Sequence, residues 1–158
     1  MTKTVLIVED YLPLREVTAR LLRCHDYEAI EVSTGEEAIS TAAERKPDVI
    51  LLDIGLPGID GWETLSRLQA INSTAEIPVI IATAQGISEV DIARGYSLGA
   101  ADYIIKPYTI EELMAAFEAA SWWKDTGRGK GPRDPVPTKR VRRTGAPATD
   151  DSASCADG

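Results

Sequence analysis

The sequence predicts an α/β fold in which helices cover both faces of a doubly wound parallel sheet of five strands. Three observations lead to this prediction. Short aliphatic runs alternate with longer segments whose apolar residues recur at helical spacing. The connections between these segments are short, as they are in βαβ units. The central run, residues 48–53, holds four consecutive aliphatic residues between two acids, which is typical of a strand buried on both faces.

The first half of this alternation has clear helix boundaries. Pro13 stands near the first turn of the first helix, where its missing N–H costs no hydrogen bond, and apolar residues follow at helical spacing. Thr34 and Glu37 have the spacing of a capping box, and Pro47 ends the helix that they begin. The predicted elements, in order, are a strand over residues 4–9, a helix over about 12–24, a strand over 27–32, a helix from residue 34 and a strand over 49–53.

The second half continues in the same way. Apolar residues from Trp62 onward form one stripe on a helix that begins at Asp60. Thr109 and Glu112 form a second capping-box pattern at the start of the last helix. The predicted elements are a helix from residue 60, a strand over 77–83, a weaker helix over about 89–98, a strand over 102–106 and a helix to about 123, which makes five helices in all.

The alternating pattern stops at residue 124. The segment that follows is rich in Gly, Pro and Arg and ends in an acidic, serine-containing stretch. Such a composition cannot bury enough apolar surface to offset the entropy of ordering the chain. We therefore expect one folded domain over residues 1–123 and a disordered tail over residues 124–158.

Charge and hydropathy limit the possible partners and compartments. Residues 1–123 hold 20 Asp and Glu against 9 Lys and Arg, and an acidic body disfavours non-specific binding to nucleic acid. No helix-turn-helix pattern follows residue 123, so we expect no direct DNA binding and an output through a downstream partner protein. No apolar run approaches the roughly 20 residues that cross a membrane, and a signal peptide is not recognisable. These features predict a cytoplasmic protein.

Polar side chains stand where four of the predicted strands end. Glu9 and Asp10 follow the first strand, Asp53 ends the third, Thr83 the fourth and Lys106 the fifth. Each residue alone is as consistent with an ordinary strand end as with a functional site, but parallel strands bring all their carboxyl ends to one edge. Carboxylates packed together require a cation, and oxygen ligands suit Mg²⁺. A cation, a lysine and a hydroxyl around Asp53 would neutralise a phosphoryl group there, as phosphoryl transfer requires.

Four segments resemble the receiver domain of two-component response regulators, and in particular the single-domain chemotaxis-type regulators. They are residues 5–10, 48–61, 80–84 and 99–107, and the resemblance extends over about residues 3–120. It implies a flavodoxin-like fold with strand order 2-1-3-4-5. It also implies phosphorylation of Asp53 by a sensor histidine kinase or a histidine phosphotransferase.

The same resemblance assigns roles to the residues at the strand ends. It implies that phosphorylation draws Thr83 toward Asp53, that Tyr103 then rotates inward, and that the surface formed by residues 89–98, 102–106 and 110–123 changes shape. This surface is also a possible homodimer interface. The implied Mg²⁺ ligands are Glu9, Asp10, Asp53 and the carbonyl of Gly55; Thr83 and Tyr103 form the switch; Lys106 binds the phosphoryl group and precedes a cis Pro107.

Two other functions fit parts of this pattern. A phosphohydrolase of the haloacid-dehalogenase type also uses an Asp nucleophile, but it requires a second carboxylate two residues later as acid or base, where this chain has Gly55. A phosphorelay intermediate, which passes the phosphoryl group on, has the same site and stays open. We therefore expect no enzyme in the usual sense, only assistance to its own phosphorylation and a slow self-dephosphorylation.

Overall fold

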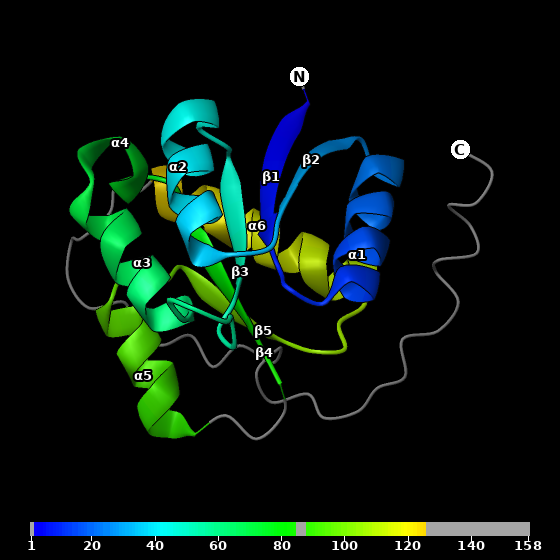
Figure 1. The fold of residues 1–158 in the computed structure, drawn as a ribbon. Helices are drawn as coiled ribbons and strands as arrows, with labels where there is room; N and C mark the ends of the chain where they lie inside the picture. Colours follow the sequence, from blue (N-terminus) through cyan, green and yellow to red (C-terminus); the bar gives the residue numbers. More distant parts are fainter. Residues whose placement is uncertain (1, 85–87, 126–158) are drawn as a thin grey trace.

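The computed structural model describes residues 2–84 and 88–125, with the last five of these described by their backbone alone. Its centre is one parallel sheet of five strands in the order β2-β1-β3-β4-β5 (Figure 1). This arrangement confirms the predicted fold class and strand order. The strands are β1 (Lys3–Val8), β2 (Tyr27–Val32), β3 (Val49–Asp53), β4 (Val79–Thr83) and β5 (Asp102–Ile105).

Six helices are described, one more than the sequence predicted. The additional helix is a single turn, α4, in the connection between α3 and β4. The hydroxyl of Thr74 donates a 2.6 Å hydrogen bond to the carbonyl of Leu68 and thereby folds this turn back onto the end of α3. The helices are α1 (Leu12–Cys24), α2 (Gly35–Arg45), α3 (Gly61–Ala70), α4 (Asn72–Ala75), α5 (Glu89–Ser97) and α6 (Ile110–Asp125).

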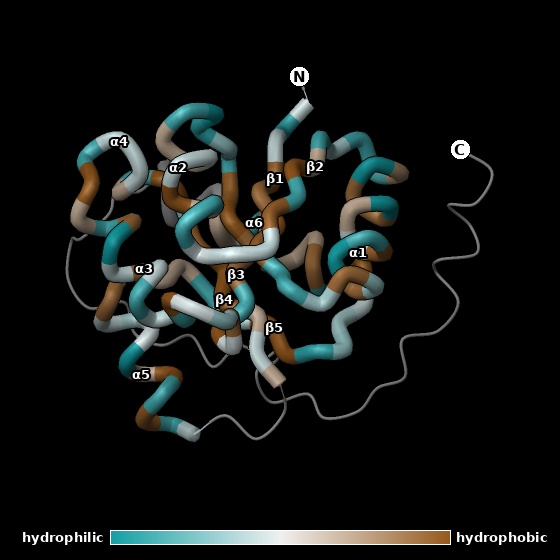
Figure 2. The backbone as a smooth tube through the Cα atoms, in the orientation of Figure 1, coloured by the Kyte–Doolittle hydropathy of each residue, from teal (hydrophilic) through white to brown (hydrophobic). Residues whose placement is uncertain are grey.

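The sheet is buried on both faces, as the aliphatic runs predicted (Figure 2). Successive residues of a strand point to opposite faces, so Val5 and Ile7 pack with α1 and α6 while Leu6 and Val8 pack with α2 and α3. Every residue of β3 and β4 is buried. Burial of these two central strands fixes their register, and with it the positions of the residues at their carboxyl ends.

The two predicted capping patterns are present. The backbone N–H of Glu37 donates to the hydroxyl of Thr34 at the start of α2. At the start of α6 the exchange is reciprocal: the N–H of Glu112 donates to Thr109 Oγ1, and the N–H of Thr109 donates to Glu112 Oε1. This second cap fixes where α6 begins, a few residues after Lys106.

The last described helix ends near the predicted end of the folded domain. Helix α6 runs to Asp125, close to the boundary predicted at residue 123. Residues 126–158, which hold most of the predicted tail, lie outside the described residues, so that prediction stays a prediction. Within residues 2–84 and 88–125, none of the helices has both the length and the apolar composition that crossing a bilayer requires.

Candidate phosphorylation and metal site

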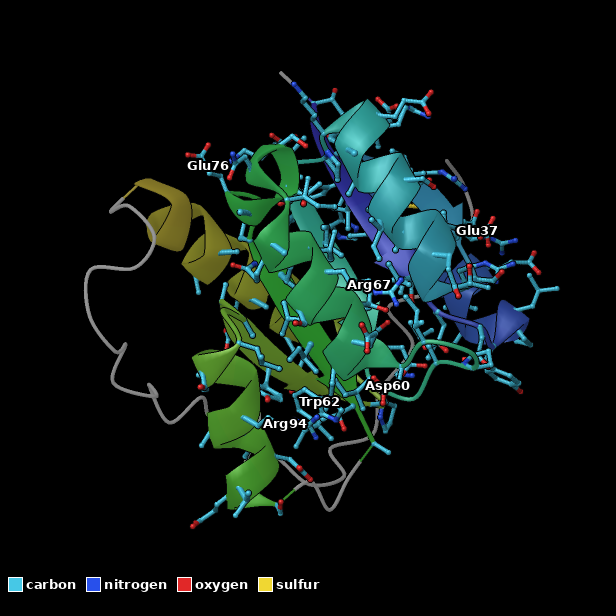
Figure 3. The ribbon with its side chains drawn as sticks, turned by 60° about the vertical axis from the view of Figure 1, so that its left-hand side comes forward. Glu37, Asp60, Trp62, Arg67, Glu76 and Arg94 are labelled. Carbon is cyan, nitrogen blue, oxygen red and sulfur yellow. The ribbon has the colours of Figure 1, made fainter. Side chains whose placement is uncertain are left out.

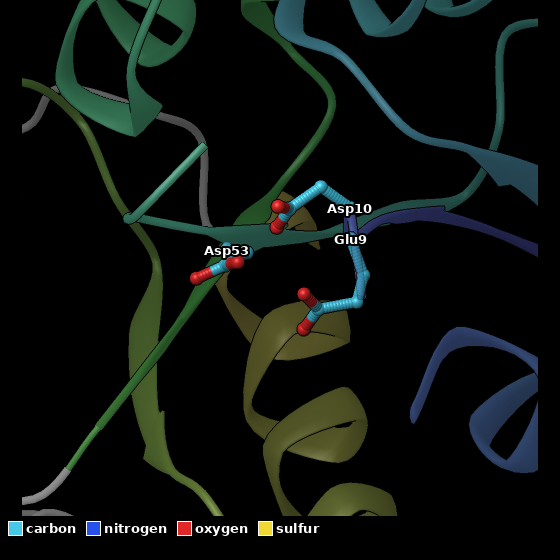
Figure 4. Close-up of side chains that lie close together, drawn as sticks. All are labelled: Glu9, Asp10 and Asp53. Carbon is cyan, nitrogen blue, oxygen red and sulfur yellow. The ribbon is translucent and has the colours of Figure 1, made fainter. Parts of the chain in front are cut away.

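Three carboxylates meet at the carboxyl edge of the sheet. Glu9 and Asp10 follow β1, and Asp53 ends β3, the strand that pairs with β1. One oxygen of each carboxylate lies within 4.8 Å of one oxygen of the other two, and the side chains face a common space (Figure 4). Glu9 and Asp53 are buried, with 5% and 8% of their surface exposed, whereas Asp10 lies at the surface. The structure thus brings together the acidic residues that the sequence predicted.

Lys106 is the cation of this cluster. Its Nζ lies 2.5 Å from Glu9 Oε1 and 3.2 Å from Asp53 Oδ1. Its backbone N–H donates to the carbonyl of Thr83 and so extends the ladder between β4 and β5. The peptide bond to Pro107 is cis, as the sequence resemblance implied. One lysine therefore faces two buried carboxylates, with a third beside them.

The electrostatic balance of the cluster favours an additional cation. Burial raises the pKa of Glu9, and the nearby charge of Asp53 raises it further. The hydrogen bond from Lys106 lowers this pKa but does not outweigh burial. In addition, three carboxylates face one lysine in this cluster, so a further cation would bring the charges closer to balance. Because all its ligand atoms are oxygens, the cluster fits a hard divalent ion such as Mg²⁺.

The loop after β3 contacts the Asp53 carboxylate through its backbone. The N–H of Gly55 donates a 3.0 Å hydrogen bond to Asp53 Oδ1, the oxygen that Lys106 also faces. Gly55 is exposed, and the nearest atom to a Cβ built there would be Asp53 Oδ1 at 3.8 Å. The absence of a side chain at residue 55 therefore keeps the approach to Asp53 open.

Thr83 and Tyr103 lie at different depths beside this edge. Thr83 is buried at the end of β4, and its hydroxyl makes a long 3.4 Å contact to the carbonyl of Ala84. Tyr103 is completely buried beneath α5, where its hydroxyl lies 2.7 Å from the carbonyl of Asp91 and 3.1 Å from that of Ile92. The sequence led us to expect an inward rotation of Tyr103 upon phosphorylation. In this structure the ring already lies inward.

Some contacts around the site had no signal in the sequence. The guanidinium of Arg94 on α5 lies 4.7 Å from the ring centre of Trp62, in the first turn of α3 (Figure 3). On α1, the side chain of Arg15 donates to the backbone carbonyl of Glu9. Thr18, also on α1, shares a 2.9 Å hydrogen bond with Tyr108. Each contact joins residues of different elements or of an element and a turn, and local sequence patterns do not show how these pack.

Comparison with known proteins identifies the family. The model of the response regulator receiver domain matches residues 5–118. The phosphate regulon transcriptional regulatory protein PhoB of Pseudomonas aeruginosa is 39% identical over an alignment of 153 residues, and the match covers 92% of this chain and 66% of that protein. The sensory transduction protein RegX3 of Mycolicibacterium smegmatis is 41% identical over 116 residues, 73% of this chain and 49% of that protein. The chain thus spans about half to two thirds of the length of these relatives.

A solved structure supports the same assignment. The receiver domain of the sensor histidine kinase PA1611 from Pseudomonas aeruginosa PAO1 superposes with a TM-score of 0.70 at 27% identity, covering 79% of this chain and 99% of that one. In that structure a magnesium ion is coordinated in the active site cleft.

The relatives correct one prediction. We expected no direct DNA binding, because residues 1–123 are acidic and no helix-turn-helix pattern follows them. The matched PhoB proteins are transcriptional regulators, and they are longer than this chain. Transcriptional regulation acts on DNA, so the prediction was wrong for this group of proteins. The net charge of a receiver domain does not show whether another segment of the same protein binds DNA. By the match over residues 5–118, together with its strand order, the chain belongs to the family of response regulator receiver domains.

Proposed function

We propose that this domain is a phosphorylation-controlled switch in which Asp53 accepts a phosphoryl group from a histidine kinase or a histidine phosphotransferase. The observation that carries the proposal is the convergence of Asp53, Glu9, Asp10 and Lys106 within one small volume at the edge of the sheet. A surface acid without function would not need a partly buried lysine and two further carboxylates around it.

The chemistry follows from the contacts of Asp53. A carboxylate oxygen of Asp53 attacks phosphorus, a new O–P bond forms, and the bond from phosphorus to the donor nitrogen breaks with its electron pair leaving on that nitrogen. Gly55 N–H and Lys106 both face Oδ1, so the other carboxylate oxygen is not held by these two donors. Lys106 is already 3.2 Å from Asp53 and can follow the negative charge onto the phosphoryl oxygens.

Glu9, Asp10 and Asp53 would hold Mg²⁺ in this reaction, and the backbone carbonyl of Gly55 is a further candidate ligand. When bound, the ion supplies charge neutralisation for the transferring phosphoryl group. The magnesium ion in the cleft of the related PA1611 receiver supports this assignment. A bound cation would also relieve the repulsion between Glu9 and Asp53, which adds to the effect of burial in raising the pKa of Glu9.

Thr83 and Tyr103 are the proposed link to the output. The hydroxyl of Thr83 makes a long 3.4 Å contact to the carbonyl of Ala84, a weak interaction that it can give up to turn toward a phosphoryl group on Asp53. Tyr103 holds two carbonyls of the first turns of α5, so any change in its position changes how α5 sits on the sheet. A small energy difference between two such arrangements is sufficient for a population shift. The names of the PhoB relatives support transcription as the process that receivers of this kind control.

The proposal is tested by incubating the purified protein with acetyl phosphate in the presence and absence of Mg²⁺. We expect one phosphoryl group per chain, seen by intact-protein mass spectrometry, labile to acid and base as an acyl phosphate is, and absent when the metal is chelated. A phosphohydrolase would instead release phosphate repeatedly from added phosphate esters. Multiple turnover on such esters without a labelled protein would contradict the proposal.

A further inference from the structure

The side chain of Arg15 connects α1 to the turn that carries the acidic pair. Its Nη1 donates a 2.9 Å hydrogen bond to the backbone carbonyl of Glu9. Its Nε lies 3.5 Å from Glu31 Oε1 on β2, and only 17% of the Arg15 side chain is exposed. The guanidinium is thus held between a strand and a turn, with a carboxylate beside it that balances its charge.

The carbonyl that Arg15 contacts belongs to the peptide group between Glu9 and Asp10. Because a peptide group is rigid and planar, fixing its oxygen also fixes the nitrogen and Cα of Asp10. The same turn is held at two other points: Glu9 N–H donates to the carbonyl of Val32, and Tyr11 N–H donates to Glu9 Oε2. Asp10 itself lies at the surface, where packing gives its carboxylate little support.

We propose that Arg15 is a positioning residue for the metal site: it orients the Glu9–Asp10 peptide so that the Asp10 carboxylate faces Asp53, while Glu31 balances its charge. The inference rests on the proposed function, since it assumes that these carboxylates hold Mg²⁺. Arg15 acts at a distance from the ion, as groups that orient metal ligands do. The positive charge of Arg15 repels a cation, so removing this charge should by itself strengthen Mg²⁺ binding. Loss of the orienting hydrogen bond should weaken Mg²⁺ binding, so the two effects have opposite signs.

Arg23 provides a matched control on the same helix. It also contacts Glu31, with Nη2 3.4 Å from Oε2, and it also donates to a backbone carbonyl, that of Ala29, at 3.0 Å. Its carbonyl partner lies in β2 and not in the turn after β1. If Arg15 only stabilised the packing of α1 on β2, removal of either arginine would have the same consequences.

The experiment measures the Mg²⁺ dissociation constant by titration calorimetry for the wild type, Arg15→Met, Arg23→Met and Asp10→Asn, with urea unfolding of each protein without metal. We expect Arg15→Met to weaken Mg²⁺ binding by about tenfold or more, in the range found for groups that orient metal ligands. We expect Arg23→Met to leave the constant unchanged. Loss of a positive charge alone would strengthen binding in the Arg15 variant.

The controls separate the two proposals. A wild type that does not bind Mg²⁺, or an Asp10→Asn protein that binds as the wild type does, contradicts the proposed metal site. The role of Arg15 alone is overturned if Asp10→Asn loses Mg²⁺ binding while a folded Arg15→Met protein binds Mg²⁺ as tightly as the wild type or more tightly. It is also overturned if Arg23→Met weakens Mg²⁺ binding as much as Arg15→Met does. If Arg15→Met does not fold, Arg15→Lys replaces it. Lysine keeps the charge but not the planar fork, so weakened binding supports the proposal and wild-type binding overturns it.

Discussion

Replacement of Asp53 by Asn is expected to reduce phosphoryl incorporation from acetyl phosphate to the background level while the fold persists. Asn has nearly the shape of Asp, and its side-chain oxygen can still accept the hydrogen bond from Gly55 N–H. The amide, however, is not a carboxylate nucleophile and cannot form an acyl phosphate. The measurement is intact-protein mass spectrometry after incubation with acetyl phosphate and Mg²⁺, and thermal unfolding checks the fold.

The same loop offers a matched control for this variant. Asp60 caps α3 by accepting a 2.9 Å hydrogen bond from the N–H of Glu63. Asn is as good an N-cap as Asp, so Asp60→Asn changes the same atoms near the site without removing the proposed acceptor. We expect Asp60→Asn to be labelled like the wild type. Labelling of Asp53→Asn at the wild-type rate would show that the acceptor lies elsewhere.

Replacement of Gly95 by Ala is expected to disturb the contact between α5 and the sheet more than any other small substitution on that helix. A Cβ at residue 95 would overlap the hydroxyl of Tyr103 and lie 2.7 Å from its ring carbon Cζ. Tyr103 is fully buried, so either its ring leaves the interior or α5 moves away. We expect the free energy of unfolding to fall by about 1–3 kcal/mol, the usual cost of overpacking.

The titration of Tyr103 reports which of these changes occurs. Burial raises the pKa of Tyr103 in the wild type, because the ionised phenolate is poorly solvated beneath α5. A ring displaced to the surface loses this penalty, so its pKa should fall toward the ordinary value of about 10. The ultraviolet absorbance of tyrosinate, compared between Gly95→Ala and a Gly95→Ala protein that also carries Tyr103→Phe, isolates the contribution of this residue.

Two controls accompany the Gly95 variant. Gly55→Ala adds the same methyl group where the nearest atom would be 3.8 Å away, and its unfolding free energy should stay close to that of the wild type. In the second control, Tyr103→Leu shortens the partner, so the cost of Gly95→Ala should be smaller in that background. Strictly additive costs would mean that residues 95 and 103 do not compete for the same space.

The sequence predicted the parts of this molecule that depend on local pattern. Buried strands appear as aliphatic runs, and parallel strands bring their carboxyl ends to one edge, so the sequence alone places Asp53 and Lys106 together. Helix α4 was missed because a single turn held by the Thr74 side chain has no apolar period. The sequence also did not reveal that Tyr103 lies inward. The fit of its ring depends on Gly95, a neighbour on another element.

Contacts between packed elements could not be predicted from the sequence either, because local patterns do not show which elements lie next to each other. Arg94 and Trp62 meet because α5 and α3 lie side by side on one face of the sheet (Figure 3). Arg15 reaches Glu9 because α1 begins at Leu12, shortly after β1 ends at Val8. In each case an arginine on an exposed helix could equally have faced solvent. Only the packed arrangement shows which arginines hold other residues in place.

Chemical trapping can show whether the acyl phosphate forms on Asp53. Borohydride reduces an acyl phosphate of Asp to homoserine, so the protein is phosphorylated with acetyl phosphate and Mg²⁺, reduced, digested and analysed by tandem mass spectrometry. We predict homoserine at residue 53 and unmodified Asp at residues 10 and 60. Trapping at Asp10, or a stable phosphoester on Thr83 with no reducible product, would contradict it.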